Sequence, residues 1–133
     1  MSKAKLHSME ELEDSWWNLY EKLLSTGRAV ELSLKIELED FLYNVQKLIH
    51  NKKLSTGENL TGDVSIDTAA FDDRQCIGDW CAHFNSTWKN HKLVGMDIGT
   101  DSLVLMVLSN EEFKTAQELA KELLHRIDVA ERL

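Results

Sequence analysis

The sequence predicts an α+β fold, in which a small, mostly antiparallel sheet packs against an N-terminal helix pair and two further helices. Residues 93–108 contain two apolar stretches around Gly99-Thr100-Asp101, which is typical of a hairpin. Stretches with apolar residues at steps of three and four lie on both sides of that hairpin, which indicates helices. The chain has 133 residues, a length that suits one domain over residues 1–133.

The first helix is expected over residues 8–25. Ser8 and Glu11 form a capping box at its start, and Gly27 lies where a C-terminal cap is expected. Its apolar face is spaced by three and four residues: Met9, Leu12, Trp16, Leu19 and Leu23.

The next segment gives two overlapping signals. Residues 30–38 alternate between apolar and polar, which indicates a strand, but from Leu34 to Leu48 the apolar spacing is helical. We expect one long helix over residues 28–50 that packs on the first helix. A strand over residues 30–38 followed by a shorter helix is the alternative.

The middle of the chain is expected to contain a loop, a short strand and a third helix. Residues 51–63 are polar with two glycines and predict an exposed loop, and residues 64–68 predict a short strand. Residues 74–91 predict a helix whose apolar stripe consists of Ile77, Trp80, Cys81, Phe84 and Trp88.

The last part of the chain predicts the hairpin and a final helix. The strands are expected over residues 93–98 and 102–108, and the second is apolar on both faces, which predicts a central strand covered on both sides. Ser109 and Glu112 form a capping box that opens a helix to the C-terminus. We expect the N-terminal helix pair on one face of the sheet and the other two helices on the opposite face.

Several large side chains are expected to be buried: Trp16, Phe41, Trp80, Phe84, Trp88, Leu105 and Leu123. A second stripe on the first helix contains Trp17, Tyr20 and Leu24. Either the second helix covers this stripe, which we favour, or the stripe is exposed and marks a contact surface.

The net charge of −8 argues against nucleic acid and anionic membrane as partners, because both require a basic face. It permits a basic protein partner. The charge is uneven: residues 1–56 hold nine acidic and eight basic side chains, whereas residues 57–133 hold fourteen and seven. With two cysteines and no apolar signal segment, the chain is expected in the cytoplasm.

The partner-binding surface is predicted to consist of carboxylates in loops around one end of the sheet: Asp63, Asp67, Asp72, Asp73, Asp97 and Asp101. These acids match no calcium-binding loop, and the five histidines show no zinc spacing, so we expect no metal. Neither a dinucleotide-binding motif nor a phosphate-binding loop occurs, and we expect no cofactor.

Cys76, Asp79 and His83 fall on one stripe of the helix predicted over residues 74–91. A thiol, an imidazole and a carboxylate are the members of a nucleophile–base–orienter set. This stripe supports an alternative function, a small enzyme or ligand-binding protein with a cleft near that helix. We expect instead a boundary cysteine and an exposed Asp–His pair, because no sharp turn or oxyanion hole is predicted beside the thiol.

A resemblance to a known family rests on one segment and on the helix rich in Glu, Leu, Ala and Lys that follows it. The segment is Met96-Asp97-Ile98-Gly99-Thr100-Asp101-Ser102-Leu103-Val104-Leu105. Over residues 93–127 it resembles an uncharacterised bacterial domain family in which an acidic hairpin with an Asp-Ser turn precedes a final helix. The resemblance implies no activity and no site residue. In size and charge the chain is also similar to bacterial immunity proteins, which bind and block a basic toxin.

These observations favour a non-catalytic, acidic protein-binding module, with immunity-type inhibition of a basic toxin as its most specific form. A homodimer, formed through the two-faced sheet or through the Trp17 stripe, is compatible with either function.

Overall fold

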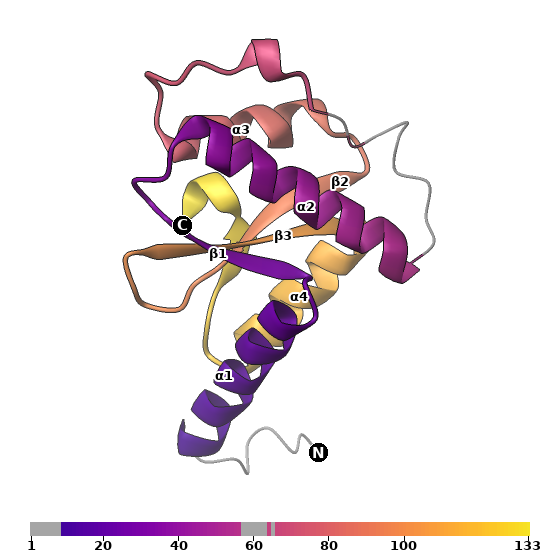
Figure 1. The fold of residues 1–133 in the computed structure, drawn as a ribbon. Coiled ribbons are helices and arrows are strands. Elements are labelled where there is room, and N and C mark those ends of the chain that lie inside the picture. Colours follow the sequence, from indigo (N-terminus) through magenta and orange to yellow (C-terminus); the bar gives the residue numbers. More distant parts are fainter. Residues whose placement is uncertain (1–8, 57–63, 65) are drawn as a thin grey trace.

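The computed structural model describes residues 9–56, 64 and 66–133, which form an α+β fold around a four-stranded sheet (Figure 1). The elements follow in the order α1 (Met9–Ser25), β1 (Ala29–Ser33), α2 (Leu38–Thr56), the 3₁₀ helix η2 (Thr68–Ala70), α3 (Ile77–Thr87), β2 (His91–Met96), β3 (Ser102–Ser109), α4 (Asn110–Glu122), β4 (Ile127–Val129) and the 3₁₀ helix η3 (Ala130–Arg132). The predicted fold class and the central hairpin, formed by β2 and β3, are confirmed.

The sheet has the strand order β1-β3-β2-β4, and every neighbouring pair is antiparallel. Because side chains alternate along a strand, Leu103, Leu105 and Val107 of β3 point to one face and Val104 and Met106 to the other. All five are buried, in two separate apolar clusters. The prediction of a central strand covered on both faces is therefore confirmed.

The two layers of helices differ from the predicted pairing. The cluster around Phe41 and Trp80 joins α2 and α3 to one face of the sheet, and the cluster around Trp16 and Ala120 joins α1 and α4 to the other (Figure 1). The expected packing of α1 on α2 is wrong, because β1 carries the chain along the sheet edge between them. The helix before β1 and the helix after it therefore lie on opposite faces of the sheet.

The long helix expected over residues 28–50 is also wrong, and the alternative of a strand followed by a shorter helix is closer to the structure. β1 pairs with β3, with Val30 opposite Leu105, and α2 begins only at Leu38. The helical spacing belongs to α2 alone, where Phe41 and Val45 are fully buried. The predicted strand corresponds to β1, and both of its faces are covered: Ala29 and Leu32, on opposite faces of β1, pack in different apolar clusters.

The final helix ends earlier than predicted, at Glu122 rather than near the C-terminus. Leu124 adopts a left-handed conformation with φ of 62°, and the His125 N–H donates to the Ala120 carbonyl at 2.8 Å, which ends the helix as a Schellman cap does. β4 then pairs with β2 and closes the edge that β2 would otherwise expose. The His125 ring stacks on Trp16 with 4.5 Å between ring centroids.

The first helix ends as predicted. Gly27 has φ of 74°, its N–H donates to the Leu24 carbonyl at 3.2 Å, and the Arg28 N–H donates to the Leu23 carbonyl at 3.0 Å. These two hydrogen bonds form a Schellman cap, and its left-handed residue favours glycine. The chain can therefore turn directly from α1 into β1.

Most of the predicted core is buried. Trp16, Phe41, Trp80, Phe84, Trp88 and Leu105 are each at most 3% exposed, whereas Leu123 is only partly buried. The stripe of Trp17, Tyr20 and Leu24 packs partly against the α1–α4 cluster, so its expected coverage by α2 is wrong.

The other sequence predictions are corrected or fall outside the structure. The helix predicted over residues 74–91 spans only Ile77–Thr87, and α2 continues into the predicted loop as far as Thr56. The described residues of the 64–68 segment form no strand, and Thr68 opens η2. Ser8 and the segment 57–63 lie outside the described residues. None of the helices in the described ranges has both the length and the apolar character required to cross a bilayer.

Candidate functional site

A groove runs between the first half of α2 and the segment 66–77, and it has two adjoining bays. The acidic bay, of about 600 Å³, is lined by residues 34–39 on one side and by Asp73, Gln75, Cys76, Ile77 and Trp80 on the other. The apolar bay, of about 490 Å³, is lined by Leu38, Glu39, Leu42, Tyr43, Gln46, Ile66, Thr68 and Asp73. Because the bays share Leu38, Glu39 and Asp73, we treat them as one site, the α2 groove.

Both walls of the α2 groove are fixed by the core. On one wall, Phe41 anchors the first turn of α2: its side chain is fully buried and its N–H donates to the Glu37 carbonyl at 2.9 Å. On the other wall, the Trp80 indole N–H donates to the Asp72 carbonyl at 2.9 Å and holds the approach to α3. The rings of Phe41 and Trp80 lie 5.3 Å apart, so the two walls meet through buried aromatic packing.

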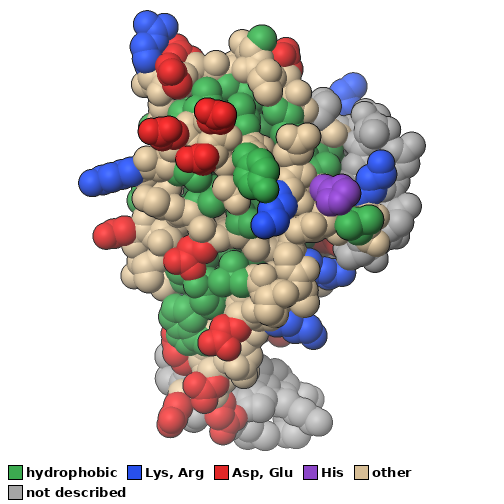
Figure 2. All heavy atoms as spheres, in the orientation of Figure 1, with side chains coloured by type: hydrophobic (Ala, Val, Ile, Leu, Met, Phe, Trp, Pro, Cys, Tyr) green, Lys and Arg blue, Asp and Glu red, His purple; other side chains and the backbone are tan. Residues whose placement is uncertain are grey.

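Three carboxylates line the acidic bay: those of Glu37, Glu39 and Asp73. All three residues are exposed, and none makes an ion pair or side-chain hydrogen bond with any described residue. Lys35 also lines the bay, so the lining carries three negative charges and one positive charge. Figure 2 shows acidic side chains gathered where α2 begins, with hydrophobic surface exposed between them. Such an arrangement attracts a cation that can also cover apolar surface.

The acids predicted from the sequence divide into two groups. In the first group the carboxylate stabilises its own loop: Asp67 accepts the Ala69 N–H at 3.2 Å, Asp72 accepts the Arg74 N–H at 2.9 Å, and Asp97 accepts the Gly99 N–H at 2.9 Å. Hydrogen bonds from the Arg74 side chain and backbone lower the pKa of Asp72.

In the second group the carboxylate accepts no such hydrogen bond from a described residue: Asp73 lies exposed in the α2 groove and Asp101 lies exposed in the β2–β3 turn. Asp63 lies outside the described residues. The β2–β3 turn is a neighbour of the groove, because Leu34 lines both the acidic bay and a hollow of about 150 Å³ beside Asp97 and Thr100. Both segments lie at the end of the sheet where β1 finishes (Figure 1).

The Cys76, Asp79 and His83 stripe is only partly assembled. Cys76 is the N-cap of α3 rather than an interior residue, and its thiol and its backbone N–H both donate to Asp79 Oδ2, at 3.2 and 3.3 Å. His83 lies seven residues further on and packs edge-on against Phe71, with 4.8 Å between ring centroids. Among the described residues no hydrogen bond joins His83 to Cys76 or to Asp79. In the described part of the chain, the thiol is thus paired with a carboxylate and not with the His83 imidazole.

The two cysteines lie in different environments. Cys76 is exposed and lines the acidic bay, whereas Cys81 is fully buried. Burial, with smaller contributions from Glu131 and Cys76, raises the pKa of the Cys81 thiol to about 12. Within the described ranges, no three side chains of His, Cys, Asp or Glu come together as a metal-binding group.

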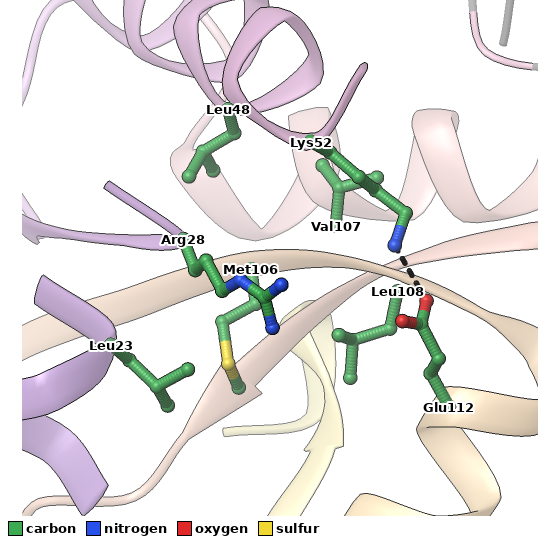
Figure 3. Close-up of a pocket in the computed structure, with 8 residues that line it drawn as sticks. All are labelled: Leu23, Arg28, Leu48, Lys52, Met106, Val107, Leu108 and Glu112. Atoms are coloured by element: carbon green, nitrogen blue, oxygen red, sulfur yellow. Dashed lines mark hydrogen bonds and ion pairs between the residues drawn. The ribbon is translucent and has the colours of Figure 1, made fainter. Parts of the chain in front are cut away.

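A smaller cavity of about 60 Å³ lies where β3 meets the ends of α1, α2 and α4 (Figure 3). The Lys52 ammonium, whose side chain is only 8% exposed, lies 2.6 Å from Glu112 Oε1, and the Arg28 guanidinium lies on the opposite side of the cavity. Glu112 also accepts the Ser109 N–H at 2.8 Å, which confirms the predicted capping box of α4. The cavity has room for about two water molecules, and its ion pair joins the helix layers of both sheet faces.

A family model described as "Domain of unknown function (DUF6630)" matches residues 3–130. The chain belongs to this family. The match confirms the resemblance to an uncharacterised domain family and extends it well beyond residues 93–127. Comparison with curated proteins and comparison with solved structures find no match to this DUF6630 protein.

The sequence reasoning missed two of the three groove carboxylates in this DUF6630 protein, Glu37 and Glu39, and also the exposed Tyr43. A signal was present: Glu37, Glu39 and Asp40 cluster as acids do in the first turn of a helix, where the helix dipole favours negative charge. Placing the helix start at residue 28 moved these acids into a helix interior and obscured that signal.

Proposed function

We propose that this protein is a non-catalytic protein-binding module that docks a basic protein partner in the α2 groove. One observation carries the proposal: three exposed carboxylates, those of Glu37, Glu39 and Asp73, line one groove, and none of them forms an ion pair with another residue in the described part of the chain. These like charges attract a basic surface over a distance set by the salt concentration, and no ion pair among the described residues has to break when that surface binds.

The charge of the whole chain supports the same partner class. At −8 it repels nucleic acid and anionic membrane and speeds encounter with a basic protein. In its most specific form, the proposal is an immunity-type inhibitor that blocks a basic toxin in the cytoplasm. Small size and acidic charge support that form.

The alternative function, a small enzyme or ligand-binding protein near α3, has one supporting observation, namely that the exposed Cys76 lines the acidic bay. A thiol nucleophile is most often activated by an imidazole base within hydrogen-bonding reach. His83 instead packs on Phe71. The binding-module proposal is therefore better supported.

The test uses matched baits. The wild-type chain, a groove variant (Glu37→Gln, Glu39→Gln, Asp73→Asn) and a control variant (Glu111→Gln, Glu118→Gln, Glu122→Gln) are immobilised and exposed to lysate at low salt. The control removes the same three charges from exposed positions on α4. We expect a basic protein that wild type and control retain and the groove variant loses.

Association rates of the recovered protein are then measured between about 50 and 500 mM salt, a range in which screening becomes strong. Wild type and control should associate several-fold faster at the lower salt, and the groove variant should lose most of that dependence. A partner retained equally by all three baits, or an association rate independent of salt, would contradict docking in the acidic groove.

A further inference from the structure

We infer that the α2 groove recognises a partner segment in which a lysine or arginine and a large apolar side chain lie about one helical turn apart. This inference rests on the proposed function and specifies the partner. The two bays differ in chemistry: the acidic bay presents Glu37, Glu39 and Asp73, and the apolar bay presents Leu42, Tyr43 and Ile66. A partner that fills both must therefore carry a cation and an apolar group side by side.

The spacing follows from α2. Glu39 lines both bays, and Tyr43 lines the apolar bay one helical turn later. Residues at positions i and i+4 of a helix have Cβ atoms about 5–6 Å apart. An occupant in register with both residues presents its cation and its apolar group at a similar spacing, which positions i and i+4 of an amphipathic helix provide.

The exposure of the apolar bay supports an occupant that is more than a polycation. The Tyr43 side chain is 66% exposed, whereas Phe41 and Val45, on the opposite side of α2, are fully buried. An aromatic ring placed beside the groove carboxylates offers an apolar contact next to the charged groups. The stem of a lysine or arginine is itself apolar and can lie along Leu38 and Ile77 while its charged head stays among the carboxylates.

The two bays are expected to affect different rate constants of binding. Exposed carboxylates mainly steer the encounter, so they set the association rate and its salt dependence. Apolar contacts are insensitive to screening and act on the dissociation rate, which usually dominates affinity differences between related complexes. Removing Tyr43 should therefore leave association nearly unchanged and speed dissociation.

The experiment uses three labelled synthetic peptides and the full chain, with binding followed by fluorescence anisotropy. The paired peptide is a helical 14-mer with Lys and Leu at i and i+4 on one face. The separated peptide has the same composition, with Lys and Leu on opposite faces, and decalysine carries charge alone. Tyr43→Ala is compared with Leu54→Ala, because Leu54 is on the same helix, is 71% exposed and lies outside the groove lining.

We expect the paired peptide to bind at least tenfold more tightly than the separated peptide. Tyr43→Ala should weaken the paired peptide at least fivefold through faster dissociation and leave decalysine unaffected, and Leu54→Ala should affect neither. Equal binding of paired and separated peptides, with no effect of Tyr43→Ala, would overturn the inference. If the groove variant still bound every basic peptide more weakly than wild type in that case, the proposed function would stand and only this inference would fail. If it weakened none, both would fail.

Discussion

Replacing Leu105 by Ala tests whether both faces of the sheet are covered by helices, as the structure of the α2 groove requires. Leu105 lies on β3 and is fully buried in the cluster that joins the sheet to α2 and α3. The substitution removes three buried carbon atoms, a loss of about 2.4 kcal/mol at about 0.8 kcal/mol each. If a cavity of roughly 50 Å³ remains, it adds about 1.2 kcal/mol at about 24 cal/mol per Å³. The free energy of unfolding should therefore fall by about 3–4 kcal/mol.

Urea denaturation followed by tryptophan fluorescence measures this loss, because Trp80 and Trp88 are buried in the same cluster as Leu105. Leu54→Ala is the matched control: it makes the same chemical change at a side chain that is 71% exposed, and it should change the stability by less than about 0.5 kcal/mol. A loss below about 1 kcal/mol for Leu105→Ala would refute the assignment of β3 as a central strand covered on both faces.

Three further predictions concern a cap, an ion pair and the thiols. Gly27→Ala should lower the free energy of unfolding, measured in urea, by about 2 kcal/mol, and Gly99→Ala should lower it by about 1 kcal/mol. Both glycines have positive φ, but of the two only Gly27 has another side chain close enough to meet an added Cβ, at 2.8 Å. Equal losses of stability for the two variants would contradict this. Burial alone would raise the pKa of Glu112, but hydrogen bonds from a lysine of α2 and from the capping serine lower it below its ordinary value of 4.5. The stability that the Glu112 carboxylate provides should therefore be complete above about pH 5 and should decline as the pH falls through the lowered pKa. Glu112→Gln should flatten that decline, and an unchanged pH profile would contradict the assignment. At pH 8 iodoacetamide should label Cys76 in the folded protein and Cys81 only after unfolding, and mass spectrometry showing both labelled at once would contradict the burial of Cys81.

The fold was predictable where local signals agreed and was mispredicted where two signals overlapped. The hairpin has a glycine turn between apolar runs, and the capping box of α4 marks a helix start, so both were located correctly. The turn between β1 and α2 contains neither glycine nor proline, so the helical spacing of α2 extended by chance through Leu34. At the end of α4, Leu124 occupies a left-handed position that usually indicates glycine, and no residue marked the helix end.

The site was less predictable because it depends on how distant segments meet. Asp73 was predicted to bind a partner, but its neighbours Glu37 and Glu39 belong to a part of the chain whose charge is nearly balanced. Only the fold brings residues 34–39 and 73–77 to one groove. The sequence also could not show that Asp67, Asp72 and Asp97 accept hydrogen bonds within their own loops, which depends on the local backbone conformation.

Chemical-shift mapping tests the central claim most directly. The ¹⁵N-labelled chain is titrated with the paired peptide at low salt, and the amide resonances that move are assigned. Docking in the α2 groove predicts that the largest changes lie in residues 37–46 and 66–77, with α1 and α4 unaffected. Changes confined to α1 and α4, with the resonances of residues 37–46 unmoved, would contradict the assignment of the groove as the binding site.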